Sequence, residues 1–207
     1  VLVEWAAGFT PTERITSMSR VIKLIDKAGA PEDVLSKLFK PGTEADAMSR
    51  FIDFANKEKV NQILTEKLDD ARFYSLHGGK FAKYVLLRID MEMWDIENFP
   101  GYPGTITVEH ILPRAPEENS EWTKKFDKKE REEWTNKLGN LVLLSGRKNS
   151  AARNYDFKTK KDKYFKRKST PFMITRKIDQ YKEWNVKNLT ERHKELIGTF
   201  KRIYSKA

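Results

Sequence analysis

The chain has 207 residues, 39% of them hydrophobic, and a formal net charge of +10 at pH 7. This composition is sufficient for one or two domains with a buried core, and no apolar run approaches the roughly 20 residues that a membrane-spanning helix requires. We therefore expect a soluble protein without a membrane partner. The absence of cysteine excludes disulfides, cysteine nucleophiles and thiolate zinc sites, which is compatible with the expected location in the cytoplasm.

The first hundred residues have apolar positions at helical spacing in several windows. The run Thr10-Pro11-Thr12-Glu13 combines a capping threonine, a proline at the first helical position and a glutamate at the third, which is typical of a helix start. Further helices are predicted to begin near Pro31 and to span about Lys80–Asp95. No motif in this part carries recognisable chemistry, so we interpret residues 1–100 as a helical linker or support region.

Turn-forming residues separate this region from the next. The segment Phe99–Gly104 has two prolines and two glycines, which predicts a domain boundary near residue 100. The β-branched run Thr105–Val108 predicts a short strand that ends at Glu109 and His110. The apolar run Leu138–Leu144 predicts a second strand, followed by a short helix. We therefore expect a mainly α fold with a small β hairpin, in the α+β class.

The positive charge is concentrated in the segment that follows. Between Arg147 and Lys177 there are twelve lysines and arginines against two aspartates, so this segment carries the whole net charge of the chain. Such an excess attracts polyanions, of which nucleic acid is the commonest, although an ordinary solvated helix face is the alternative. The chain is predicted to be helical again from Tyr155, with His193 exposed on a highly charged final helix.

The order of strand, histidine, second strand and helix suits phosphodiester hydrolysis. This reaction requires a base that takes a proton from water and a divalent cation that neutralises charge on the phosphate. A neutral histidine such as His110 suits the first task, and carboxylate or amide oxygens suit the second. Glu109 and His110 point in opposite directions if their strand is regular, which argues against a shared site unless the strand ends or bulges there. Asn140 is placed to hydrogen-bond the backbone of the loop that carries His110.

Three segments resemble the HNH, or ββα-metal, nuclease motif in its His-Asn-Asn form. They are Glu109–Pro113, Leu138–Leu144 and Lys148-Asn149. The step of nine residues from Asn140 to Asn149 also fits the spacing in the HNH domain of RNA-guided DNA nucleases.

The resemblance implies a role for each motif residue. His110 is the general base, Glu109 and Asn149 hold a Mg²⁺ or Mn²⁺ ion, and Asn140 is the structural asparagine. Together His110, Asn140 and Asn149 form the expected catalytic set. The glutamate replaces an aspartate that is commoner at this position of HNH sites. The final asparagine replaces a histidine, which weakens a preference for metals that bind imidazole and favours Mg²⁺ or Mn²⁺, which prefer oxygen ligands. The expected fold is a ββα-metal HNH core embedded in helices over residues 101–207.

From about Thr105 to Ile203 the chain also resembles the C-terminal nuclease domain of GmrSD-type modification-dependent restriction enzymes and of the antiphage nuclease SspE. In that family a ParB-like nucleotide-hydrolysing domain usually precedes the nuclease, and no part of this sequence matches it. We therefore expect the effector module of an antiphage restriction system, linked to an N-terminal sensor or nucleotide-hydrolysing domain. A single HNH site nicks one strand per event, so a double-strand break would require a homo-oligomer or two nicks.

The basic segment supplies candidate contacts to DNA phosphates. They are Arg147, Lys148, Arg153, Lys158, Lys160 and Lys161. Two other functions stay open: a nucleic-acid-binding module with an inactive HNH-like site, and an RNA-directed nuclease on the same scaffold. The second would use aromatic residues of the basic segment to stack on unpaired bases. These aromatic residues are Tyr155, Phe157, Tyr164 and Phe165.

Overall fold

A computed structural model describes residues 2–38, 52, 56–94, 99, 101–102, 104–146 and 154–205. The chain divides into two compact units, residues 1–67 and residues 68–207. The sequence places the boundary near residue 100 instead. The difference arises because helix α5 (Lys80–Glu92) packs on the sheet of the second unit and therefore belongs to it.

The first unit contains the helices α1, α2 and α3 and most of α4. Their bounds are Leu2–Ala6, Pro11–Lys27, Pro31–Leu38 and Lys57–Leu68. The predicted start of α2 is confirmed, because Oγ1 of Thr10 accepts a hydrogen bond from the Glu13 amide at 3.2 Å and the Glu13 carboxylate accepts one from the Thr10 amide at 2.6 Å. These two reciprocal bonds satisfy amides that the first helical turn leaves unpaired.

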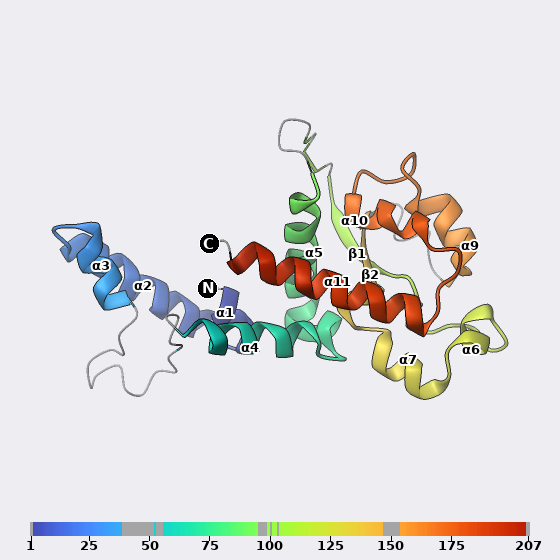
Figure 1. The fold of residues 1–207 in the computed structure, drawn as a ribbon, viewed down its shortest axis with the longest axis horizontal. Coiled ribbons are helices and arrows are strands. Elements are labelled where there is room, and N and C mark those ends of the chain that lie inside the picture. The colour runs from blue at the N-terminus through green and yellow to red at the C-terminus, as the bar shows by residue number, and fades with distance from the viewer. Residues whose placement is uncertain are drawn as a thin grey trace. The chain divides into compact units, whose positions relative to one another are not determined.

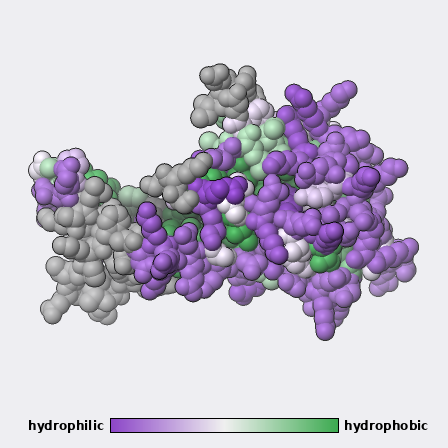
Figure 2. Space-filling model, viewed as in Figure 1, coloured by the Kyte–Doolittle hydropathy of each residue, from purple (hydrophilic) through white to green (hydrophobic). Residues whose placement is uncertain are grey.

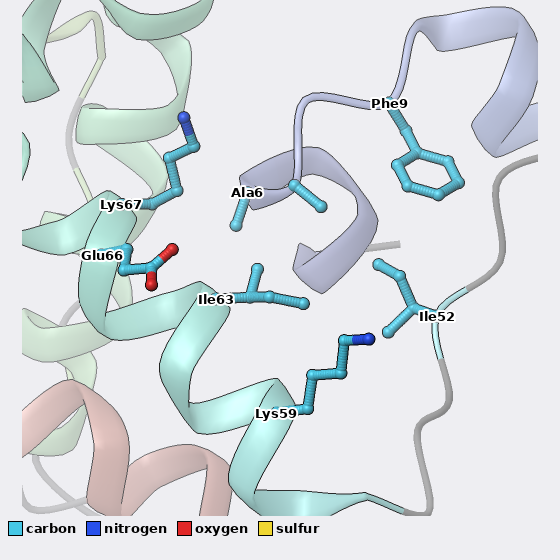
Figure 3. Close-up of a pocket in the computed structure, with 8 residues that line it drawn as sticks. Ala6, Phe9, Ile52, Lys59, Ile63, Glu66 and Lys67 are labelled. Atoms are coloured by element: carbon cyan, nitrogen blue, oxygen red, sulfur yellow. The ribbon is translucent and has the colours of Figure 1, made fainter.

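A pocket of about 460 Å³ in the first unit mixes apolar and charged side chains, as Figure 3 shows. It is lined by Ala6, Ala7, Phe9, Ile52, Lys59, Ile63, Glu66 and Lys67. None of these is among the residues that the sequence predicts for catalysis or for contact with nucleic acid.

The second unit is mainly helical, with one small sheet among its described residues (Figure 1). Its helices besides α5 are α6 (Glu121–Lys125), α7 (Lys128–Trp134), α9 (Phe157–Lys160), α10 (Met173–Arg176) and α11 (Val186–Ser205). It also has three 3-10 helices, η2 (Phe73–Gly79), η4 (Leu138–Asn140) and η6 (Lys177–Gln180), and a π-helix, η5 (Lys161–Phe165), among its described residues. The predicted α+β class is confirmed.

The sheet pairs β1 (Ile106–His110) with β2 (Leu141–Ser145) in antiparallel register. His110 lies opposite Leu141. Residues 141–144 are fully buried, because α5 and α10 both pack against β2. The second strand begins at Leu141, three residues later than the sequence predicts. The preceding residues form η4, which packs against α11.

The main core of the second unit includes residues of the loop that follows β1. It contains Ile111, Leu112, Trp122, Phe126, Val142, Leu144, Phe157, Tyr164, Phe165, Ile178, Trp184 and Leu189. Of the four aromatic residues considered for stacking on bases, Phe157, Tyr164 and Phe165 therefore belong to the core, and Tyr155 is exposed. Among the described helices, none is long and apolar enough to cross a membrane.

Candidate functional site

His110 stands at the end of β1 with only 6% of its surface exposed. Its Nε2 atom lies 3.1 Å from Oδ1 of Asn136. A carboxamide oxygen only accepts hydrogen bonds, so the neutral imidazole carries its proton on Nε2 and presents a lone pair at Nδ1. The ring of Tyr74 meets the imidazole edge-on, with 4.4 Å between the ring centroids. The imidazole is therefore fixed both in orientation and in tautomer.

The surroundings of His110 favour its neutral form. Burial lowers the pKa of His110 to about 4, the hydrogen bond to Asn136 opposes this shift, and the cations Arg114 and Lys160 add to it. A neutral imidazole is the form that can accept a proton, so His110 is in the correct state for a general base near neutral pH.

Asn140, in the second motif segment, is completely buried and contacts the first motif segment. Its Oδ1 accepts a hydrogen bond from the Leu112 amide at 2.8 Å, and its Nδ2 donates to the carbonyls of Leu112 at 2.9 Å and Thr135 at 2.8 Å. The Trp184 indole also donates to Oδ1, at 3.3 Å. These are the backbone contacts that the sequence predicts for Asn140, and they tie the loop after His110 to the start of β2.

Two neighbouring residues of α11 fix the turn that contains Asn140. The Arg192 guanidinium is buried and donates hydrogen bonds to the carbonyls of Gly139 and Leu141. His193 accepts a hydrogen bond from the Gly139 amide at 3.1 Å and contacts Oδ1 of Asp69 through Nε2 at 2.9 Å. The prediction that His193 is exposed is wrong, because this face of the charged helix packs on η4.

Glu109 has a different partner from its neighbour in the strand. Its Oε1 lies 2.7 Å from the ammonium of Lys160, which is completely buried and also donates to the carbonyls of His110 at 2.6 Å and Ile111 at 3.2 Å. Burial raises the pKa of Glu109, and the Lys160 ammonium opposes this shift. The pairing of β1 with β2 stays regular through His110, so the strand end does not bulge to bring the two side chains together.

The described residues alone do not make up a metal site. No group of three or more histidine, cysteine, aspartate or glutamate side chains among them lies close enough to hold a metal ion. Glu109 offers an oxygen of the type that Mg²⁺ and Mn²⁺ prefer, but Lys160 already binds it. Asn149, the other predicted ligand, lies outside the described residues.

The basic segment contributes less to the surface than its sequence suggests. The prediction that Lys160 contacts DNA phosphate is wrong, because its ammonium is buried against Glu109. Lys161 is 20% exposed and is held by Asp179 at 3.4 Å. Lys158 is exposed. Arg147, Lys148 and Arg153 lie outside the described residues. In the view of Figure 2, hydrophilic residues nevertheless cover most of the visible face of the second unit.

The structure adds contacts that sequence reasoning missed. Asn136 and Tyr74 come from separate segments, and no sequence pattern pairs either of them with His110. Beside them lies a second pocket, of about 430 Å³. It is lined by Arg114, Pro116, Lys128, Arg131, Glu132, Thr135 and Asn136. Arg114 could have pointed to this pocket from the sequence, because it directly follows Pro113 at the end of the first motif segment.

A family model matches more than half of the chain. It is described as "GmrSD restriction endonucleases, C-terminal domain" and matches residues 58–199. The matched segment contains β1, β2, the turn with Asn140 and most of α11. No curated protein matches the chain.

Proposed function

The chain belongs to the family of GmrSD restriction endonuclease C-terminal domains, and on this basis we propose that it is an HNH-type endonuclease that hydrolyses DNA phosphodiester bonds. Membership makes it a restriction-type nuclease domain. The finer assignment rests on one observation: the buried His110 imidazole is held by Asn136 at 3.1 Å in the tautomer that leaves Nδ1 able to accept a proton.

In the proposed reaction, Nδ1 of His110 takes a proton from the water that attacks the phosphodiester. Asn140 keeps the loop after His110 in register with β2 through its bonds to Leu112, and so it fixes the position of the base without touching the substrate. Asn136 fixes the imidazole itself. The protein residues thus supply a base that is oriented before the substrate binds.

We expect the reaction to require Mg²⁺ or Mn²⁺, held by Glu109 and Asn149. When bound, such an ion supplies positive charge that neutralises the phosphate in the transition state. Support comes from the carboxylate at the end of β1 and from the motif spacing, in which Asn149 follows Asn140 by nine residues. Because Lys160 binds Glu109 at 2.7 Å, we expect the affinity for the cation to depend on that pair.

The biological role follows from the family. We propose that the chain is the effector of an antiphage restriction system that acts on DNA, linked to an N-terminal sensor or nucleotide-hydrolysing domain. With one histidine base per chain, a single event nicks one strand, and breaks in both strands require two copies or two successive nicks.

Plasmid cleavage tests this proposal. With Mg²⁺ or Mn²⁺ the wild-type chain should convert supercoiled plasmid to the open-circular form, and a chelator should abolish the conversion. The His110→Ala variant should lose about 100-fold or more of the rate, because removal of a general base costs this much. Lys129→Gln, a change at an exposed lysine of α7, serves as the control and should cleave like the wild type.

Four results would contradict the proposal. Full activity of a folded His110→Ala variant would show that His110 is not the base. Full activity in chelator would show that the reaction needs no divalent cation. Salt-sensitive DNA binding without cleavage in either metal indicates an inactive binding module instead. Preferential cleavage of RNA in a competition with duplex DNA indicates an RNA-directed nuclease.

A further inference from the structure

The pocket lined by Arg114, Lys128 and Arg131 adjoins the candidate base through one shared residue. Asn136 lines this pocket and also holds Nε2 of His110 at 3.1 Å. A group bound there therefore lies one side chain away from the imidazole. The pocket in the first unit has no comparable link to the predicted site residues.

The charge of this pocket is positive. Three cationic side chains and one carboxylate, Glu132, line it. Lys128 is 84% exposed at its side chain, and its contact with Glu132 is long, at 3.9 Å. An exposed pair at this distance contributes little, so the ammonium of Lys128 is available to another anion.

Two of the cations are held in place by the protein. Nη1 of Arg131 donates to the carbonyl of Phe126 at 2.6 Å. The Arg114 guanidinium lies 5.9 Å from the ring centroid of Tyr74, the same ring that contacts His110. Holding these guanidinium groups before a ligand binds reduces the entropy lost on binding.

We propose that this pocket binds a backbone phosphate of the substrate strand, next to the phosphodiester that is cut. The inference rests on the proposed nuclease function and names a contact that places its substrate. Guanidinium groups match phosphate oxygens in charge and geometry, and phosphate contacts set the register of a nucleic acid on a protein without reading its sequence. None of the described residues that line the pocket is aromatic, so these side chains offer no platform on which a base would stack.

Adjacent lysines of α7 provide a matched test. Lys128 lines the pocket, whereas Lys129 is exposed and does not line it, so Lys128→Gln and Lys129→Gln remove the same charge from neighbouring positions. Binding of the full chain to a fluorescently labelled DNA duplex is measured by anisotropy over a range of salt concentrations, in chelator, so that cleavage does not interfere. Arg114→Gln is measured in the same way.

The Lys128→Gln and Arg114→Gln variants should each bind about fivefold more weakly, and each should lower the slope of log affinity against log salt by about one. Lys129→Gln should bind within about twofold of the wild type, since it removes no phosphate contact. Equal losses at Lys128 and Lys129, or none at either, would overturn the proposal. If only a duplex with 5′-phosphates shows the difference, the pocket binds a terminal phosphate and the backbone contact is refuted.

Because binding is measured without cleavage, the two proposals fail separately. A chain that never cuts DNA but shows the expected difference between Lys128 and Lys129 would keep the phosphate pocket and lose the nuclease function. If the protein cuts DNA with His110 as base but Lys128→Gln and Lys129→Gln bind DNA equally well, the nuclease function stands and the phosphate pocket is refuted.

Discussion

Nε2 of His110 and Oδ1 of Asn136 are 3.1 Å apart, so a half-buried carboxamide determines which nitrogen of a buried imidazole carries the proton. The two residues are 26 positions apart in the chain. This single contact selects Nδ1 as the atom that accepts a proton in the proposed reaction.

Asn136→Ala should reduce the rate of plasmid cleavage by about 10- to 100-fold, because loss of a residue that orients the reacting group typically costs this much. Asn136→Asp should retain most of the rate and move the acidic limb of the pH–rate profile to higher pH, since a carboxylate stabilises the imidazolium. The unfolding midpoint in urea checks that both variants are folded. An unchanged pH–rate profile in Asn136→Asp would contradict the positioning role.

Asn140→Ala should destabilise the fold by roughly 3 to 5 kcal/mol, because it leaves buried backbone groups of Leu112 and Thr135 without their partner. Denaturant unfolding measures the effect. Asn188→Ala is the control: its side-chain amide donates one exposed hydrogen bond, to the Glu183 carbonyl at 3.0 Å, and its loss should cost about 1 kcal/mol or less. Similar losses in the two variants would show that Asn140 is not the structural centre of the motif.

Lys160→Met should destabilise the protein by about 3 kcal/mol, because it leaves the Glu109 carboxylate, whose side chain is 12% exposed, without its counter-ion. Adding Glu109→Met to this variant should recover most of the loss. The salt dependence of DNA binding should stay unchanged in Lys160→Met, since a buried ammonium contacts no phosphate. A smaller slope of log affinity for DNA against log salt in Lys160→Met would instead indicate that Lys160 contacts DNA.

The low pKa of His110 makes the folded state sensitive to acid. Burial holds this pKa at about 4 in the folded protein, whereas an unfolded histidine titrates near pH 6.5. Between these values the unfolded chain binds the additional proton, so stability is complete above about pH 6.5 and falls as the pH drops toward 4. The contribution is on the order of 3 kcal/mol.

Urea unfolding at a series of pH values, for wild type and His110→Gln, measures that contribution. The wild type should lose more stability than the variant between neutral pH and pH 4. His193 also has a pKa lowered by burial, but it is present in both proteins and cancels in the difference. Parallel curves for the two proteins would contradict the burial of a neutral His110.

Gly139→Ala should destabilise the fold by about 1 to 3 kcal/mol, because the added methyl group overpacks the contact between η4 and α11. A Cβ at this position would lie 2.6 Å from Cβ of His193 and 2.9 Å from the Leu189 carbonyl oxygen. Gly146→Ala is the matched control at the end of β2, where the nearest atom would be Cβ of Thr105 at 3.5 Å. Thermal unfolding should show a clear drop in midpoint for the first variant only.

The sequence by itself determined the features that depend on neighbouring residues. The start of α2 follows from Thr10 and Glu13, which are three positions apart and satisfy each other's amides. The two strands follow from β-branched and apolar runs, and the structural character of Asn140 follows from its place in the second motif segment. The helix start and the strands depend on an interaction of short range or on a pattern within one element, and both are visible in the order of residues.

Only the tertiary structure decided which side chains are buried and with which partners. Lys160 reads as one more cation of a basic segment, yet it lies against Glu109, which is 51 positions away. His193 reads as exposed, yet it contacts Asp69 across 124 positions. Charge runs and helical periodicity describe one element at a time, whereas the partner of a buried polar group is selected by packing between elements that are far apart in the chain.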